Sequence, residues 1–87
     1  MEKLVTISNE SGLHARPAAI FVKTASQFNS QISIEARGSS VNAKSIMNIL
    51  SLGLKKGDEV KIVVNGVDEK EAMEALVELV ESKFNEA

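Results

Sequence analysis

The stretch GLHARPAA, residues 12–19, holds the side chains of this chain that are best suited to chemistry. His14 is the only histidine, Pro17 is the only proline, and Arg16 lies between them. A histidine ring with an unperturbed pKa of about 6.5 is mostly neutral near neutral pH, so it can act as a nucleophile. A guanidinium group is well suited to binding phosphate oxygens. These residue types indicate a phosphoryl acceptor at His14, with a solvated cap or loop histidine as the alternative.

Other chemistries fit the chain less well. A metal ion needs three or four ligands, and one histidine without a nearby Asp or Cys does not supply them. The chain has no cysteine, which excludes disulfides, zinc-thiolate sites and thiol redox chemistry. Ser11 lies close to His14, but no GxSxG elbow of a serine hydrolase occurs. We therefore expect neither a metal nor a cofactor.

The elements around residues 12–19 place His14 just before a helix. Residues 2–8 alternate polar and apolar side chains, which predicts a strand, and residues 16–28 carry an apolar stripe at helical spacing. Pro17 favours the first helical turn and disfavours helical backbone at Arg16, which predicts Arg16 as the cap residue. Gly12 can adopt a positive φ that folds the loop back over the helix end. The unpaired N–H groups of a helix start form an anion site, so the ring would lie beside a phosphate cradle.

The rest of the chain predicts an α+β domain. Strands are expected at 31–36, 40–43 and 59–65, a short helix at 45–53, and a last helix that begins with a capping box of Asp68 and Glu71. The order β-α-β-β-α-β-α predicts an antiparallel sheet with helices on one face. A ferredoxin-like sandwich shares much of this succession, so the pattern leaves the strand order open.

Composition narrows the class of protein. The 87 residues are 44% hydrophobic and 25% charged, which predicts one globular domain over 1–87. The net charge is −2, the ten basic residues are scattered, and the only aromatic residues are three Phe, so nucleic-acid binding is disfavoured. The N-terminus has neither a signal core nor an apolar run long enough to cross a bilayer. We expect a cytoplasmic protein without membrane insertion.

Two motifs at a characteristic separation give the chain a family resemblance. GLHARPAA, followed by NAKSIMNILSLGLKKGDEV, resembles the histidine-containing phosphocarrier HPr of the bacterial phosphoenolpyruvate:sugar phosphotransferase system, in its Gram-positive type. The resemblance covers essentially the whole chain. It implies an open-faced β-sandwich, a four-stranded antiparallel sheet in the order 1-4-2-3 covered on one face by three helices.

The resemblance also implies a function. Nδ1 of His14 would accept a phosphoryl group from enzyme I and pass it to sugar-specific permease components, with Arg16 as the phosphate partner and with Ala15, Arg16 and Pro17 cradling the group. The chain would then be a stoichiometric phosphocarrier rather than a self-contained enzyme, and a monomer. Another HPr-like phosphocarrier, such as one of the nitrogen branch, is the alternative.

A second site is implied at Ser45. From its residues, Ser45 is predicted to be the N-cap of the short helix. By resemblance it would be phosphorylated by HPr kinase/phosphorylase, and the modified protein would bind a catabolite-control regulator in carbon catabolite repression. A two-turn helix cannot bury all its apolar residues on one face. On the first predicted helix, Ile20 falls on the polar side. The predicted partner surface is Ile20, Ile46, Met47 and Leu50. A regulatory protein that acts mainly through Ser45 therefore stays open as a second class of function.

Overall fold

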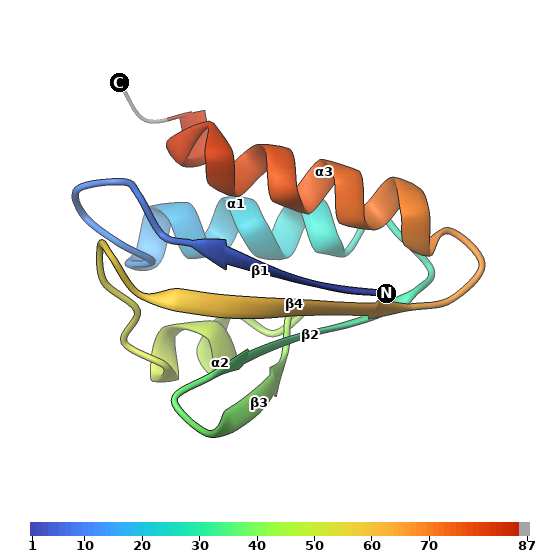
Figure 1. The fold of residues 1–87 in the computed structure, drawn as a ribbon, viewed down its shortest axis with the longest axis horizontal. Helices are drawn as coiled ribbons and strands as arrows, with labels where there is room; N and C mark the ends of the chain where they lie inside the picture. The colour runs from blue at the N-terminus through green and yellow to red at the C-terminus, as the bar shows by residue number, and fades with distance from the viewer. Residues whose placement is uncertain (86–87) are drawn as a thin grey trace.

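The fold of the described residues is a four-stranded sheet with helices packed on one side (Figure 1). The computed structural model describes residues 1–85. The predicted order of strands and main helices is confirmed, and a 3₁₀ turn follows the last helix. The elements are β1 (Glu2–Thr6), α1 (Ala15–Ala25), β2 (Gln31–Ala36), β3 (Ser39–Asn42), α2 (Ile46–Ser51), β4 (Glu59–Asn65), α3 (Glu69–Glu81) and η1 (Lys83–Asn85).

The sheet is antiparallel throughout, with the strand order β1-β4-β2-β3. The order expected from the family resemblance is thus confirmed. Val5 lies opposite Val60, and Ile34 lies opposite Ile62, so one face of the sheet is lined by buried β-branched side chains. Side chains on the other face remain in solvent, and Leu4 there is 62% exposed. An antiparallel sheet with one covered face gives this alternation of buried and exposed residues.

Helices α1 and α3 run antiparallel and side by side over the sheet (Figure 1). Phe21 of α1 is buried and meets the ring of Phe84 edge-on, with 6.5 Å between the ring centroids. Such aromatic pairs contribute about 0.5–1.5 kcal/mol beyond their area burial. The hydrophobic core between sheet and helices therefore fixes the direction of α1, and with it the position of the residue at its start.

Two predicted element boundaries are wrong by a few residues. The first helix ends at Ala25 rather than Phe28, because the N–H groups of Gln27 and Phe28 donate to carbonyls three residues back, at 3.1 and 3.2 Å. These short-range bonds tighten the chain into turns and end the α-helix. The first strand ends at Thr6, and Ile7 instead exchanges hydrogen bonds with the loop before β4.

The predicted capping box of Asp68 and Glu71 is also wrong. Asp68 occupies the N-cap position of α3 but makes no cap bond. Its carboxylate accepts hydrogen bonds from the backbone N–H groups of Asn29 and Ser30, at 2.8 and 3.0 Å, and from the Ser30 hydroxyl. Glu69 accepts from the Gly66 N–H at 3.2 Å. The tertiary partners in the 26–30 turn therefore replace the local cap, and Asp68 ties the end of α1 to the start of α3.

This role of Asp68 makes the stability of the fold depend on pH. The Ser30 hydroxyl and the backbone N–H groups lower the pKa of the Asp68 carboxyl. A lowered folded-state pKa means that Asp68 stabilises the fold above its unfolded pKa of about 3.9. That contribution is lost as pH falls through the lower folded-state value. We expect Asp68→Asn to be less stable than the parent at neutral pH and to approach it in strong acid, as measured by urea unfolding.

Glu71→Gln is the matched control, because it also removes an exposed carboxylate from the first turn of α3. It should leave the acid side of the stability profile close to that of the parent. An Asp68→Asn profile that stays parallel to the parent at every pH would show that the carboxylate bonds to residues 29 and 30 do not contribute.

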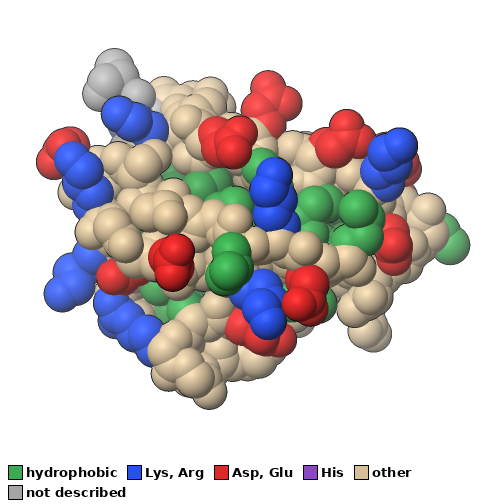
Figure 2. Space-filling model, in the orientation of Figure 1, with side chains coloured by type: hydrophobic (Ala, Val, Ile, Leu, Met, Phe, Trp, Pro, Cys, Tyr) green, Lys and Arg blue, Asp and Glu red, His purple; other side chains and the backbone are tan. Residues whose placement is uncertain are grey.

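The surface of the molecule is mixed in charge. Figure 2 shows acidic side chains along α3 and basic ones interspersed with acidic ones over the sheet. Basic side chains gather at the end where the loop before α1 lies (Figures 1 and 2). Within residues 1–85, no helix combines the length and the apolar composition needed to cross a membrane.

Candidate functional site

The loop between β1 and α1 is anchored to the loop that precedes β4. The Ile7 N–H donates to Asp58 O at 2.9 Å, the Gly57 N–H donates to Ile7 O at 2.7 Å, and the Leu13 N–H donates to Leu54 O at 3.0 Å. The predicted positive φ of Gly12 is confirmed at +65°. A Cβ at Gly12 would lie 2.5 Å from Leu54 O, so only glycine allows the two loops to come this close.

His14 lies at the N-cap of α1. Its backbone is extended, with φ −84° and ψ −168°, and its carbonyl accepts the first helical hydrogen bond from the Ala18 N–H at 2.9 Å. The side chain is exposed and makes no cap bond to the helix backbone. The prediction that His14 lies immediately before a helix is confirmed, and its ring is directed to the surface rather than used to cap α1.

The prediction that Arg16 caps this helix is wrong, because α1 already begins at Ala15. The physical reason is that the first residues of a helix need no intrahelical acceptor, so Pro17 is tolerated as the third helical residue. The N–H groups of Ala15 and Arg16 precede the first intrahelical bond. Pro17 has no N–H and is buried, so it contributes packing and backbone shape rather than a donor. Arg16 is exposed in the first turn.

The charges near this loop are mostly basic. Lys55 and Lys56 belong to the loop that anchors the residues before His14. Lys56 forms an exposed ion pair with Glu10 at 2.5 Å, and the hydrogen bond and charge of Lys56 lower the pKa of the Glu10 carboxyl. Exposed pairs of this kind contribute little to stability. Arg16, Lys55 and Lys56 instead make this end of the molecule attractive to anionic groups.

Ser45 is the N-cap of α2, as predicted. Its backbone is extended, and its Oγ accepts a hydrogen bond from the Asn48 N–H at 3.4 Å. The first turn of α2 carries no acidic residue. The helix ends at Ser51, and Gly53 adopts the predicted left-handed conformation, with φ +59°. The start of α2 therefore presents a partly exposed hydroxyl beside positively polarised N–H groups.

Comparison with known proteins matches the sequence of this chain to one family. The family model described as "PTS HPr component phosphorylation site" matches residues 1–82. This chain belongs to the HPr family. It is 47% identical over 83 residues to the HPr-like protein Crh of Halalkalibacterium halodurans, a match that covers 95% of this chain and 99% of that protein. It is 43% identical over 86 residues to the phosphocarrier protein HPr of Xylella fastidiosa, covering 99% and 97% of the two chains.

The structure agrees with HPr structures over its whole length. The crystal structure of HPr-C-His from Thermoanaerobacter tengcongensis superposes with a TM-score of 0.96 at 56% sequence identity. That match covers 100% of this chain and 98% of the other. The HPr family supplies phosphocarriers of the phosphotransferase system. Both the resemblance and the HPr fold predicted from the sequence are confirmed.

The predicted partner surface of this HPr-family chain is only partly exposed. On α2, Met47 is 72% and Ile46 is 36% exposed, as expected for a short helix with apolar residues around much of its circumference. Leu50 and Ile20 are half-buried and pack against the hydrophobic core. The expectation of an exposed Ile20 on the polar side of the first helix was therefore too simple, because α1 and α2 pack against each other.

Sequence reasoning missed Asn9 as part of the HPr loop. Asn9 is only 1% exposed, and its side-chain amide donates to Gly12 O at 2.7 Å and to the Ser11 Oγ at 3.4 Å. Asn often bonds to nearby backbone groups in turns. An Asn three residues before a Gly, between a strand and a helix, is the signal that could have identified it.

Sequence reasoning also missed Arg37 and Asp58. The Arg37 guanidinium donates to Asp58 Oδ2 and to Leu52 O, the latter at 3.1 Å. The Asp58 carboxylate also accepts from the Lys55 N–H at 2.8 Å. The hydrogen bond from the Lys55 N–H has the largest effect, and together with Arg37 it holds the pKa of the Asp58 carboxyl below its usual range. These contacts tie the β2–β3 turn to the loop that anchors residues 7–13. They therefore help to hold the loop that carries His14, although none of these residues belongs to it.

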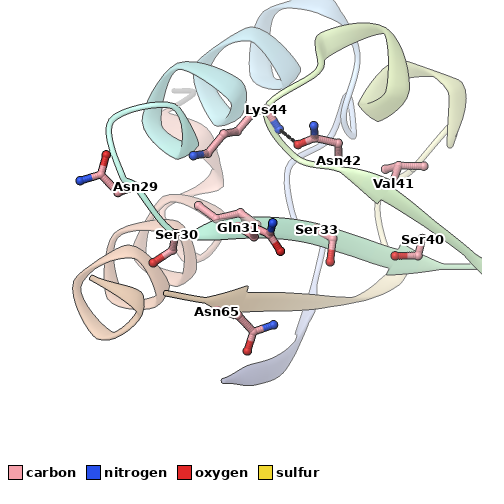
Figure 3. Close-up of a pocket in the computed structure, with 10 residues that line it drawn as sticks. Asn29, Ser30, Gln31, Ser33, Ser40, Val41, Asn42, Lys44 and Asn65 are labelled. Carbon is pink, nitrogen blue, oxygen red and sulfur yellow. Dashed lines mark hydrogen bonds between the residues drawn. The ribbon is translucent and has the colours of Figure 1, made fainter. Parts of the chain in front are cut away.

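A polar hollow of about 440 Å³ lies at the other end of α1 (Figure 3). Ser33 and Asn42 line it from β2 and β3, with Lys44 beside Asn42 at the top of this view and Asn65 at the bottom. Lys44 donates to Phe28 O at 2.6 Å, at the turn that follows α1. An 11-residue helix is about 16 Å long, which separates this hollow from His14. Residues 1–85 contain no cluster of three or more His, Cys, Asp or Glu side chains suited to a metal ion.

Proposed function

We propose that this chain carries phosphoryl groups on Nδ1 of His14, from phosphorylated enzyme I to sugar-specific permease components in the cytoplasm. The observation that carries the proposal is the exposed His14 at the N-cap of α1, followed by an exposed Arg16, in a chain of the HPr family. The chain is then a stoichiometric carrier rather than a self-contained enzyme. It needs neither a metal nor a cofactor for this transfer.

The transfer exchanges one nitrogen–phosphorus bond for another. The lone pair on Nδ1 of the neutral His14 ring attacks phosphorus, while the bond from phosphorus to the donor's histidine breaks and its electrons return to that ring. In-line transfer of this kind depends on positioning and on stabilising the charge of the phosphoryl oxygens. An exposed ring at the end of a helix can be approached by a large protein donor and later by a different acceptor.

Arg16 and the start of α1 supply the groups that stabilise this charge. The N–H groups of Ala15 and Arg16 belong to the helix N-terminus, which favours anions. The Arg16 guanidinium can add charge-assisted hydrogen bonds to two phosphoryl oxygens. Pro17 shapes the first turn of this cradle without donating. Arg16 is therefore assigned as the phosphate partner of His14.

The test is incubation of the chain with enzyme I and phosphoenolpyruvate. We expect an intact-mass increase of one phosphoryl group that is lost in acid and stable in base, which distinguishes phosphohistidine from phosphoserine. Omission of enzyme I should leave the mass unchanged. A chain that gains no group in the presence of an active enzyme I would contradict the proposal.

A regulatory role through Ser45 is the second part of the proposal. The similarity to an HPr-like protein Crh favours it, and Ser45 is a partly exposed helix cap beside exposed Ile46 and Met47. We propose that HPr kinase/phosphorylase modifies Ser45 and that the modified chain binds a catabolite-control regulator. The presence of His14 favours a carrier that is also regulated over a purely regulatory protein.

Phosphorylation of Ser45 should stabilise the fold and slow the charging of His14, that is, the transfer of a phosphoryl group from enzyme I to its ring. A phosphate at the N-cap of α2 lies at the positive end of the helix dipole, where a negative charge contributes about 0.3–1 kcal/mol. The same charge beside Met47 adds a desolvation cost to docking of enzyme I. We expect a higher melting temperature and a higher apparent KM for enzyme I, with Ser45→Asp giving both effects more weakly.

Ser51→Asp is the matched control for Ser45→Asp. Ser51 is exposed at the opposite end of the same helix, where a negative charge is unfavourable. The Ser51→Asp variant should therefore have a lower melting temperature than the parent. If phosphorylation of Ser45 lowers the melting temperature and leaves the KM unchanged, the regulatory role of the cap is excluded.

We propose further that residues 1–87 act as one domain and as a monomer, since the proposed site is built from loops and helices of a single chain. An HPr dimer from Thermoanaerobacter tengcongensis has been crystallised, so assembly is a property to measure for this chain. Light scattering at the concentration of the transfer assay tests it, and a dimer that charges as fast as the monomer would exclude the proposal.

A further inference from the structure

Asn9 is the most deeply buried polar side chain in the loop that leads to His14. It is 1% exposed, although it belongs to the loop between the end of β1 and the start of α1. Burial of an amide is costly unless its donors are used. We infer that Asn9 is a positioning residue for His14 in phosphoryl transfer, an inference that rests on the proposed function of His14.

Hydrogen bonds between Asn9 and Gly12 close the loop in both directions. The Asn9 side-chain amide donates to Gly12 O at 2.7 Å, and the Gly12 N–H donates back to Asn9 O at 3.1 Å. The same amide donates to the Ser11 Oγ at 3.4 Å. Residues 9–12 are thereby held as one compact turn, in which Gly12 keeps its left-handed conformation.

This turn is connected to His14 through a single intervening residue. The Gly12 carbonyl held by Asn9 belongs to the peptide unit that also carries the Leu13 N–H, and this N–H donates to Leu54 O at 3.0 Å. The peptide unit is thus fixed at both of its polar ends, with Asn9 on one side and the 52–58 loop on the other. The next residues are Leu13, which is buried, and His14 at the helix cap.

The consequence concerns where the ring lies relative to the cradle at the start of α1. If the Asn9 bond is lost, the Gly12–Leu13 peptide keeps only one anchor and can rotate, which moves the backbone of His14. A displacement of about 1 Å in a reacting group can cost about 100-fold in rate. The exposed residues of the proposed partner surface, Ile46 and Met47, lie on α2 and take no part in this bond, so the loss should fall on kcat rather than on KM.

The test compares Asn9→Ala and Asn9→Ser with the parent in charging by phosphorylated enzyme I. We expect kcat to fall about 10-fold or more, with KM within about twofold. Because the chain has one histidine, its ring resonances in an NMR spectrum are unambiguous, and they should shift or broaden in both variants. Asn42→Asp is a control for changing an asparagine, since it is exposed and its Oδ1 accepts from the Lys44 N–H.

A stability control separates positioning from a general loss of structure. Ile34→Val trims the core in β2 without touching the loop, and it should lower the melting temperature while leaving kcat and the ring resonances as in the parent. All variants are assayed below their melting temperatures, as fixed by circular dichroism. Should Asn9→Ala not fold, Asn9→Ser, which keeps a small polar group, decides the question alone.

Each outcome has one meaning. Folded Asn9 variants with the kcat and ring resonances of the parent would overturn the inference while leaving the role of His14 intact. A loss of kcat in Ile34→Val of the same size as in Asn9→Ser would also overturn it, because stability alone would then explain the effect. A parent protein that becomes charged without any change in its His14 resonances would instead refute the proposed function.

Discussion

His14→Ala is expected to give a folded protein that accepts no phosphoryl group. His14 is exposed and lies outside the hydrophobic core, and substitutions at such surface positions usually change stability little, so the variant should fold. No other histidine exists in the chain to replace it. The measurements are the intact mass after incubation with enzyme I and phosphoenolpyruvate, and the far-UV circular dichroism spectrum of the variant.

Lys23→Ala is the matched control for this experiment. Lys23 is exposed in the last turn of the same helix, away from the cap, and its variant should become charged like the parent. If His14→Ala still gains an acid-labile phosphoryl group, His14 is not the acceptor and the proposed carrier chemistry fails.

Gly12→Ala is expected to lose both stability and transfer. A left-handed φ costs a non-glycine residue about 1–2 kcal/mol. The new Cβ would also lie 2.5 Å from Leu54 O and 2.9 Å from Lys55 Cα, which are backbone atoms that cannot give way alone. A forced shift of packed backbone adds about 1–3 kcal/mol. The two loops must separate, so the Leu13 bond to Leu54 weakens and the start of α1 moves with it.

Gly38→Ala is the matched control, because it introduces the backbone strain without the clash. Gly38 has a similar left-handed φ of +78°, but a Cβ there would meet nothing within 4 Å. Its melting temperature should fall by about 4–8 °C per kcal/mol of strain, with charging of His14 unchanged. Gly12→Ala should melt lower than Gly38→Ala and charge more slowly, and equal behaviour of the two variants would show that the close approach of the loops is not needed.

Much of the fold could be predicted because it depends on local patterns. The alternation in Glu59–Asn65 and the stripe in Ala15–Ala25 each fix an element by the side chains that must be buried. The position of His14 before a helix follows from the strand and helix patterns on either side of it and from Pro17, whose preference for the first helical turn is local. The serine cap of α2 was predictable for the same reason.

The features that the sequence did not reveal depend on partners far along the chain. Asp68 had the spacing of a helix cap, but the N–H groups of residues 29 and 30 took its carboxylate. The ion pair of Arg37 and Asp58 forms only because the β2–β3 turn meets the loop before β4 in the folded chain. The strand order was left open by periodicity, and only the family resemblance supplied it. Such contacts join residues separated by tens of positions, which no local propensity records.

Phosphoryl transfer through Nδ1 of His14 is tested most directly by an NMR spectrum of the ring nitrogens before and after phosphorylation by enzyme I. Because there is one histidine, each ring nitrogen gives one assignable signal. We expect the Nδ1 signal to shift and to show the one-bond coupling to phosphorus, which Nε2 should lack. Both signals should return to their original positions when the group is passed to a permease component. A charged protein whose ring nitrogens are unchanged, with the phosphoryl group on another side chain, would contradict transfer through Nδ1.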